Sequence, residues 1–258
     1  MVATQTPAPA WLPGTGAASA SPAAGASVAI DPYAAGRAPA DNYRLLVSGI
    51  VPRPVGFVST VSAAGVRNLA PFSYFQVANH DPPVFTLGFS QGQGVAKDTA
   101  ANLAATRECT ISIVSEHFVE AANYTAIDAP AGTDEWLLSG LTPVASDAVA
   151  PPWVGESVFS VEARLLHTHD WHARATGAKS GMLAIVEGVR FHVKEKALKD
   201  GVIDPEMLRP IARLGGISYA RLESRFELPR PSWAVEKERG EVKEALARAV
   251  EVEGVLKN

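Results

Sequence analysis

The sequence has a single cysteine, Cys109, among its 258 residues. A lone cysteine excludes an intramolecular disulfide and is typical of a protein of the reducing cytoplasm, which is the location we expect. Cys109 lies in the alternating segment Glu-Cys-Thr-Ile-Ser-Ile-Val. We therefore expect a buried strand residue rather than a catalytic thiol.

Long apolar runs and clustered basic residues are also missing. No apolar run approaches the roughly 18 residues of a membrane-spanning helix. Lys and Arg number 23 against 27 Asp and Glu, for a formal net charge of −4, and the first basic residue is Arg37. A nucleic-acid surface needs many clustered cations, and a secretory signal needs a basic start. We expect no membrane, secretory signal or nucleic-acid partner.

Three common catalytic or nucleotide-binding motifs do not occur. The Gly-x-Ser-x-Gly elbow of many hydrolases is missing, as is the Gly-x-x-x-x-Gly-Lys-Ser/Thr phosphate loop. Gly92-x-Gly94 lacks the third glycine of a dinucleotide fingerprint. Regular alternation of strands and helices is missing too, which argues against a doubly wound fold.

What is present predicts three regions. Residues 1–36 are rich in Ala, Pro and Gly, without charge up to Ile30, and are expected to form a disordered leader. Residues 37–231 contain six alternating segments that return on one another, which predicts a mainly β fold, a β-barrel with peripheral helices. Residues 232–258 predict an amphipathic helix that packs on the barrel or on a partner chain.

A glycine-rich turn runs directly into a helix between Gln91 and Asn102. Lys97 stands beside the expected N-cap, Asp98 or Thr99, and Asn102 follows one turn later. Unpaired amides, the helix dipole and an ammonium group together suit a phosphate. An ordinary glycine turn into a capped helix is an equally good reading of this segment alone.

Two further segments have unusual chemistry. Pro52 and Pro54 hold Arg53 in extended backbone. The segment Asn68 to Phe75 places hydrogen-bonding groups beside three aromatic rings, which suits a planar heterocycle, although core packing explains each ring singly.

His167, His169 and His172 form the one cluster in the sequence with the side-chain chemistry of a metal site, and His192 could join them. Carboxylate partners at ligand spacing are missing, so we expect no metal there.

Taken together, these segments resemble the flavin reductase-like family, the FMN-binding split barrels. The resemblance covers about Tyr43 to Pro231. It rests on segments in the family's order: Ile50 to Thr60 (IVPRPVGFVST), Asn68 to Phe75 (NLAPFSYF), Asp81-Pro82-Pro83, Lys97-Asp98-Thr99 with Asn102, and Leu214-Gly215-Gly216 with Tyr219.

The resemblance implies a Greek-key-like split barrel that forms a homodimer with FMN at the interface. A phosphate-binding role falls on Lys97, Asp98, Thr99 and Asn102, and Tyr219 approaches the flavin from the far side or from the neighbouring chain. The residues implied in cofactor binding are Arg53, Pro54, Ser59, Thr60, Asn68, Ser73, Phe75, Lys97, Asp98, Thr99, Asn102 and Tyr219.

The resemblance also implies a function. We expect an FMN-dependent oxidoreductase that takes hydride from NADH or NADPH, with Arg53 stabilising negative charge on the reduced flavin. The electrons would pass to a partner monooxygenase or to a small acceptor such as a nitro compound or quinone. Two alternatives remain open: an electron-transfer or sensor protein like flavoredoxin, and a split barrel that binds pyridoxal phosphate or haem.

Overall fold

The computed structural model of the protein describes residues 1–91 and 96–256, with side chains through residue 248. The chain divides into two compact units, one of residues 38–222 and one of residues 1–37 with 223–258. All residues predicted to bind a cofactor belong to the 38–222 unit. The predicted boundaries after residues 36 and 231 stay predictions.

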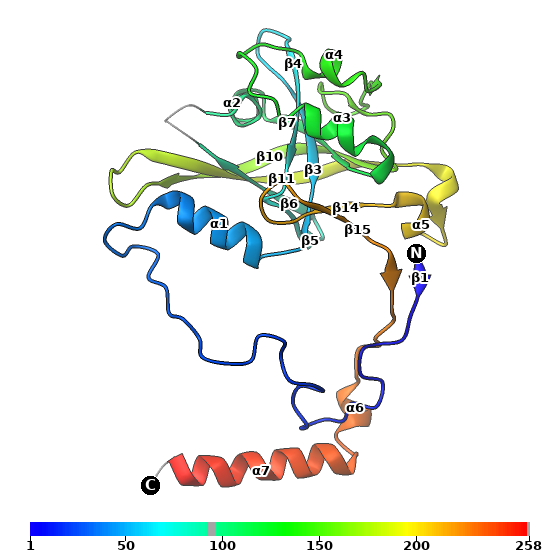
Figure 1. The fold of residues 1–258 in the computed structure, drawn as a ribbon. Helices are drawn as coiled ribbons and strands as arrows, with labels where there is room; N and C mark the ends of the chain where they lie inside the picture. Colours follow the sequence, from blue (N-terminus) through cyan, green and yellow to red (C-terminus); the bar gives the residue numbers. More distant parts are fainter. Residues whose placement is uncertain (92–95, 257–258) are drawn as a thin grey trace. The chain divides into compact units, whose positions relative to one another are not determined.

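A seven-stranded antiparallel sheet forms the body of the 38–222 unit (Figure 1). Its pairing order is β4-β3-β7-β10-β11-β6-β5. The edge strands β4 and β5 follow each other in the chain with only Ser73 and Tyr74 between them, so the sheet curls until its edges approach. The mainly β prediction is thereby confirmed. The strands are β3 (Gly56–Val61), β4 (Arg67–Phe72), β5 (Phe75–His80), β6 (Pro83–Ser90), β7 (Glu108–Ile113), β10 (Phe159–His172) and β11 (Lys179–Val193).

Strand alternation divides the buried side chains into two cores. Val58 packs inside the curled sheet with Leu87, Ile111 and Leu103 of α2 (Asp98–Thr106). Phe57, its neighbour in the chain, points the other way and joins a second core beneath the outer helices. Cys109 lies in the inner core with no exposed surface, and burial followed by the charge of Glu108 raises its pKa to about 12. The expectation of a buried structural cysteine is confirmed.

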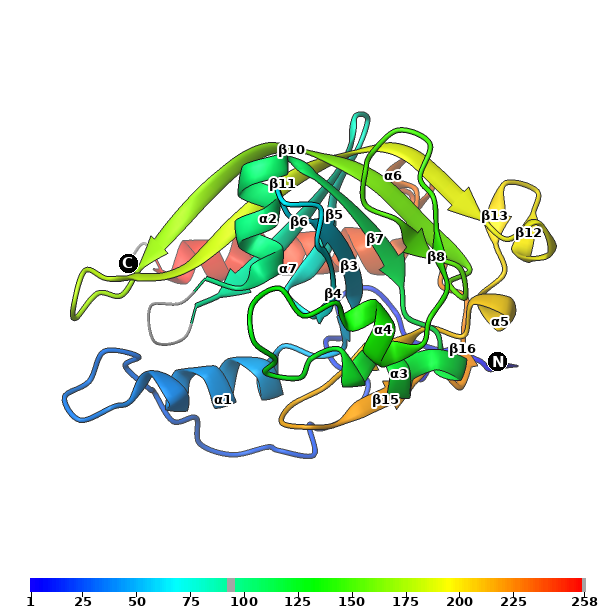
Figure 2. The ribbon, with the colours of Figure 1, turned by 90° about the horizontal axis from the view of Figure 1, so that it is seen from above.

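Short helices cover the sheet. Seen from above, α2 lies by the β10–β11 pair, while α3 (Val119–Tyr124) and α4 (Glu135–Ser139) lie together on the side of β3 and β4 (Figure 2). The remaining helices of this unit are α1 (Pro39–Gly49), α5 (Pro205–Leu208) and the 3-10 turns η1 (Glu116–Phe118) and η2 (Glu195–Ala197).

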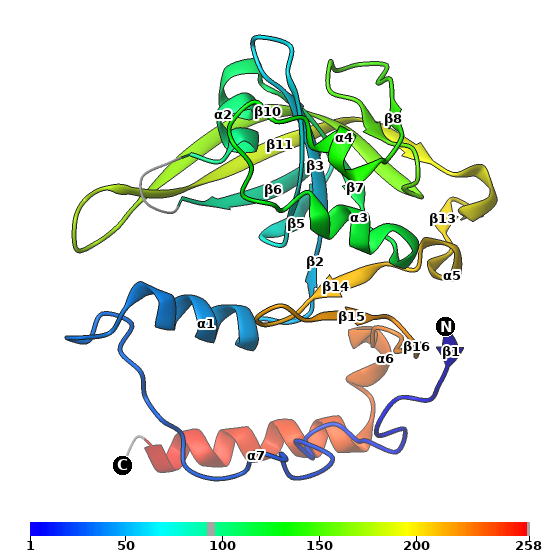
Figure 3. The same ribbon diagram turned by 45° about the horizontal axis from the view of Figure 1, so that its top comes forward.

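A small second sheet extends the first. The chain enters β3 through β2 (Arg53–Pro54), which pairs with β14 (Ile211–Arg213), and β14 pairs with β15 (Tyr219–Arg221) (Figure 3). This arrangement brings α1, β2 and the turn after β14 together. Two further two-stranded ladders are β8 (Pro143–Val144) with β9 (Trp153–Val154) and β12 (Leu198–Lys199) with β13 (Val202–Ile203).

Local signals in the sequence explain several element ends. Asp204 caps α5 by accepting from the amide of Glu206 at 2.9 Å, with Pro205 as the first helical residue. The chain changes direction between the edge strands, because β4 ends at Phe72 and β5 turns to pair with β6. One expectation about an element end was wrong. The N-cap of α2 is Lys97, not Asp98 or Thr99.

The other unit is simple. Its strand β1 (Val2–Ala3) pairs in parallel with β16 (Ser224–Arg225). The helices α6 (Trp233–Glu236) and α7 (Gly240–Leu256) lie in the segment predicted to be helical. Within the residues that the structure describes, no helix is both long and apolar enough to cross a membrane.

Candidate functional site

A cavity of about 700 Å³ lies in the 38–222 unit. Its walls come from α1, β2, the β4–β5 junction, the start of α2, the loop 125–131 after α3, and the turn after β14. A cavity of this size accommodates a small organic ligand. Six predicted cofactor residues line it: Arg53, Asn68, Ser73, Lys97, Asp98 and Thr99. The other six are not part of its wall: Pro54, Ser59, Thr60, Phe75, Asn102 and Tyr219.

The first turn of α2 forms one end of the cavity. Lys97 is the N-cap residue, its side chain is exposed, and it makes no side-chain cap to the helix. The first-turn amides and the positive end of the helix dipole therefore lie at the wall with Lys97, Asp98 and Thr99. Such a helix end suits a phosphate. The predicted glycine turn, Gly92 to Val95, lies outside the described residues.

A hydrogen-bonded group of polar side chains braces this anion end. Asn68 on β4 donates from its amide to the hydroxyl of Thr99 at 2.8 Å and to that of Thr60 at 3.3 Å. Asn102, one turn into α2, donates to Thr60 at 3.1 Å. Thr60 has no exposed surface, so it and Asn102 lie behind the wall and hold Asn68 and Thr99 in place.

Arg53 lines the cavity, but its guanidinium is held by the protein backbone. It donates to the carbonyls of Val47 at 2.6 Å, Ile50 at 2.7 Å and Leu214 at 2.9 Å. Its Nε donates to the hydroxyl of Ser73 at 3.4 Å. The side chain is only 8% exposed. Arg53 thus ties α1, β2 and the turn after β14 together, which the sequence did not reveal.

Tyr219 and Phe75 support the cavity from outside its wall. The Tyr219 hydroxyl donates to Asn123 Oδ1 at 3.0 Å, and the Arg213 guanidinium lies 4.4 Å from the centre of the Tyr219 ring. Arg213 itself lines the cavity, so Tyr219 positions it. Phe75 stacks on Phe85 in the inner core, with ring centres 6.2 Å apart.

Pro54 and Ser59 make no wall contact either. Pro54 is exposed and pairs with Ala212 in the small sheet. Ser59 has no exposed surface, and its hydroxyl has no hydrogen-bond partner among the described residues. Both residues therefore lie on the strands that carry the site rather than at the cavity.

Three aromatic side chains line the same cavity as the polar groups. Tyr43, Phe72 and Tyr74 line the cavity. Phe72 is fixed by an edge-to-face contact with Phe89, with ring centres 4.8 Å apart. Burial, followed by the neighbouring Tyr43, raises the pKa of Tyr74, while the charge of Arg53 lowers it. Of the three aromatics of Asn68 to Phe75, two reach the cavity and one is core.

Sequence reasoning missed Glu135 and the loop 125–131, which also line the cavity. Glu135 is only 7% exposed, and its Oε2 accepts from the amide of Leu69 at 3.1 Å. Burial raises its pKa, the Leu69 amide lowers it, and the charges of Asp98 and Asp134 raise it. The one local signal was Asp134, the N-cap of α4, which places Glu135 at the start of that helix.

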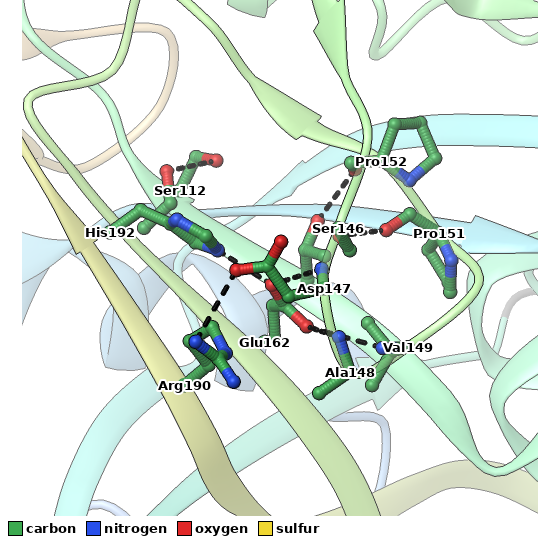
Figure 4. A network of polar contacts seen from close by, with 12 residues as sticks. Ser112, Ser146, Asp147, Ala148, Val149, Pro151, Pro152, Glu162, Arg190 and His192 are labelled. Carbon is green, nitrogen blue, oxygen red and sulfur yellow. Dashed lines mark hydrogen bonds and ion pairs between the residues drawn. The ribbon is translucent and has the colours of Figure 1, made fainter.

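The histidines considered as a possible metal site, His167, His169 and His172, lie on β10 and are exposed. His169 packs edge-on against Trp171 at 4.3 Å between ring centres. In the part of the chain that the structure describes, they do not form a group of metal-ligand geometry; the group found is Asp147, Glu162 and His192, with ligand atoms within 4.8 Å of one another. It lies where β10 and β11 meet the loop before β9 (Figure 4).

Hydrogen bonds already occupy the buried carboxylate of that group. Glu162 has no exposed surface. Its Oε1 accepts from the amide of Asp147 at 2.8 Å and meets Nε2 of His192 at 2.6 Å, and its Oε2 accepts from the amides of Ala148 at 2.6 Å and Val149 at 3.2 Å (Figure 4). A metal ion would have to displace these bonds, so the group is better explained as an anchor of the 147–149 loop.

Several known proteins are similar to this chain. The model of the flavin reductase like domain matches residues 48–210. An uncharacterised protein of Halalkalibacterium halodurans is 37% identical over 195 residues, covering 74% of this chain and 92% of the relative. Nitrilotriacetate monooxygenase component B from Bacillus cereus has a structure with a TM-score of 0.75 and 36% identity, covering 79% of this chain and 100% of that chain.

A more distant structure shares the fold. Flavoredoxin of Desulfovibrio vulgaris (Miyazaki F) has a TM-score of 0.58 at 23% identity, covering 72% of this chain and 94% of that chain. The family model spans more than half of the chain, and the cavity lies largely within the matched residues. The chain therefore belongs to the flavin reductase-like family, whose split-barrel fold it shares.

Proposed function

We propose that this protein is an FMN-dependent oxidoreductase that uses NADH or NADPH to reduce its flavin. The observation that supports this best is the cavity, because it joins a phosphate-binding helix start to a wall of aromatic rings and hydrogen-bonding groups. Membership of the flavin reductase-like family supports a flavin cofactor and oxidoreductase chemistry.

The residues at the wall fit FMN. Lys97, Thr99 and the first-turn amides of α2 would hold the phosphate, and Asn68 keeps Thr99 in place. The apolar surface of Phe72 and Tyr74 and the hydroxyl of Ser73 suit the flat ring and its polar edge. Thr60 and Asn102 act through Asn68 and Thr99 rather than by contact with the cofactor.

When bound, FMN supplies the redox chemistry, accepting hydride from the nicotinamide and passing electrons to an acceptor. The protein supplies position and charge. Arg53 presents a positive charge that its backbone partners hold still, so it favours negative charge at the wall without having to reorganise. Arg213, braced by Tyr219, adds a second fixed cation.

The acceptor in this proposal is a partner monooxygenase or a small molecule. The similar Bacillus cereus protein is component B of nitrilotriacetate monooxygenase, which favours the first of these. The buried thiol of Cys109 and the need for a nicotinamide donor fit a cytoplasmic location.

We propose in addition that the protein is a homodimer with FMN at the interface. Apolar side chains are exposed on α1 and after it: Leu45 at 48%, Leu46 at 53% and Ile50 at 61%. They adjoin Tyr43 and Tyr74, which are exposed and also line the cavity. A second copy is the occupant expected for such a surface, because it would cover the apolar residues and the cavity together.

Sedimentation velocity tests the dimer. The FMN-loaded protein is expected to sediment with twice the chain mass, and Leu46→Glu should shift it toward the monomer because a charge would be buried in the interface. The matched control is Leu137→Glu, on α4, where the side chain is 76% exposed. A wild-type protein that stays monomeric at all concentrations contradicts this proposal.

The visible spectrum of the FMN-reconstituted protein tests the function. Recorded without oxygen, the flavin bands are expected to bleach within seconds after addition of NADH or NADPH, and the faster donor is the physiological one. Bands that persist with both donors would favour an electron-transfer or sensor protein. A protein that retains no flavin and does not accelerate flavin reduction would overturn the proposal.

The matched variants for this experiment are Lys97→Ala and Lys196→Ala. Loss of Lys97 removes a charge-assisted contact to phosphate, so the Kd for FMN should rise about tenfold. Lys196 is an exposed lysine on η2, outside the cavity, and its loss should leave the Kd unchanged. Equal affinities of the two variants at low salt would count against the phosphate position.

A further inference from the structure

The charges at the cavity wall pose a problem for a phosphate ligand. Three cations, Arg53, Lys97 and Arg213, line the cavity together with three carboxylates, Asp98, Asp128 and Glu135. The guanidiniums of Arg53 and Arg213 are bound to backbone carbonyls. The Arg53 and Arg213 side chains are thus held in place, whereas the Lys97 ammonium makes no hydrogen bond to a described residue, and a dianionic phosphate at the start of α2 would meet it together with the carboxylates of the same wall. Repulsion would weaken binding unless one carboxyl becomes neutral.

Glu135 is the carboxyl placed to become neutral. It is 7% exposed, whereas Asp128 is exposed. Its Oε2 accepts from the amide of Leu69, the residue next to Asn68, so it stands at the phosphate end of the cavity. Burial already disfavours its charged form and raises its pKa. The carboxyl is therefore closer to protonation than an exposed acid.

The charged groups around Glu135 act in the same direction. Asp98 on α2 raises its pKa, and so does Asp134 on its own helix. Asp134 is itself paired with Arg67 on β4 at 2.6 Å, which limits its effect. Lys97 at the start of α2 and Asp128 in the loop 125–131 also line the cavity. The Lys97 ammonium would pair with the phosphate and so would not offset the charge of Glu135.

We propose that Glu135 takes up a proton when a phosphate group binds at the start of α2, so that FMN binding is coupled to proton uptake. This inference rests on the proposed function. The neutral carboxyl can keep accepting from Leu69 through one oxygen while the other carries the proton and donates it as a hydrogen bond to the phosphate. Glu135 then favours a phosphorylated ligand over riboflavin, because riboflavin has no phosphate charge to drive protonation and no phosphate oxygen to accept the hydrogen bond.

Titration calorimetry measures the coupling directly. FMN is titrated into the full-length protein at pH 6.5 to 8 in HEPES and in Tris, and the dependence of the heat on the buffer gives the number of protons taken up. We expect uptake by the wild type with FMN and none with riboflavin. The Kd for FMN should rise with pH, by up to about tenfold per unit for one fully coupled proton. Protonation of FMN itself has the opposite sign, because a site that selects the dianion releases that proton.

Glu135→Gln is the decisive variant. The amide oxygen can still accept from Leu69, so the fold is kept, while no proton can be bound. We expect proton uptake, and the rise of the Kd with pH that it causes, to disappear. Asp128→Asn is the matched control, an exposed carboxylate of the same cavity, and it should retain both.

The outcomes separate this inference from the proposed function. FMN binding without proton uptake by the wild type overturns the role of Glu135 and leaves the function standing, and so does uptake that persists in Glu135→Gln. Equal uptake with riboflavin also overturns it, because the phosphate would then not be the cause. A wild type that does not bind FMN overturns the proposed function and this inference with it.

Discussion

Replacing Arg53 with methionine is expected to destabilise the 38–222 unit by about 3 to 5 kcal/mol. The guanidinium donates to the carbonyls of Val47, Ile50 and Leu214 and to Ser73, and methionine leaves these acceptors without a partner. Each buried acceptor left unsatisfied costs about 1 to 3 kcal/mol. Urea unfolding followed by near-ultraviolet circular dichroism measures the loss.

The matched control is Arg44→Met. Arg44 lies on α1 beside the same junction, but it is exposed and pairs with Asp41 across one helical turn. Its loss should cost no more than about 1 kcal/mol. If Arg53 served the cofactor chiefly as a charge, Arg53→Met would weaken FMN binding and barely move the urea midpoint, and that pattern would contradict the structural role.

Replacing Glu162 with alanine should have an effect of similar size, about 3 to 5 kcal/mol, although the residue is not part of the cavity. The change leaves the amides of Asp147, Ala148 and Val149 without the carboxylate that is their one acceptor among the described residues. The His192 ring, stacked on Trp153 with ring centres 4.7 Å apart, loses its partner as well. Faster hydrogen exchange of the three amides would localise the loss to the 147–149 loop. Wild-type protection of these amides in Glu162→Ala would refute the anchoring role.

The stability that Glu162 provides also depends on pH. Burial raises its pKa, while the Asp147 amide, the His192 ring and the Ala148 amide lower it, and the net pKa lies below the ordinary value. The contribution is therefore complete above the unfolded pKa of about 4.3 and is lost as the pH falls through the lower folded pKa. The stability difference between wild type and Glu162→Gln should be constant near neutral pH and should shrink below about pH 4.

The sequence predicted several residues of the cavity wall because the signals for them lie within short segments of the chain. A helix start that binds anions needs only a few consecutive residues, and the structure places Lys97, Asp98 and Thr99 at the cavity wall. Residues two positions apart on a strand face the same side, and in β3 both faces are buried, with Val58 in the inner core and Phe57 in the second core. Helix caps such as Asp204 with Pro205 are equally local.

The residues that sequence reasoning missed or misplaced depend on distant partners. Arg53 was expected to serve the flavin, yet one of its acceptors, Leu214, is 161 residues away in the chain. Glu135 binds the amide of Leu69, 66 residues earlier. Contacts between residues so far apart in the chain leave no periodicity or fixed spacing in the sequence, so neither could be predicted from it. Phe75 and Tyr219 were assigned to the cofactor; they lie outside the cavity wall, in contact with Phe85 and Asn123, and their assignment stays a prediction.

The sequence by itself determined most of the strands, the capped start of α5 and the buried cysteine, because alternation and capping act between residues a few positions apart. Only the tertiary structure decided which side chains reach the cavity, which ones brace it from behind, and which carboxyl lies near the start of α2. Those outcomes depend on the curling of the sheet, which brings β4, α2 and α4 together from three separate parts of the chain.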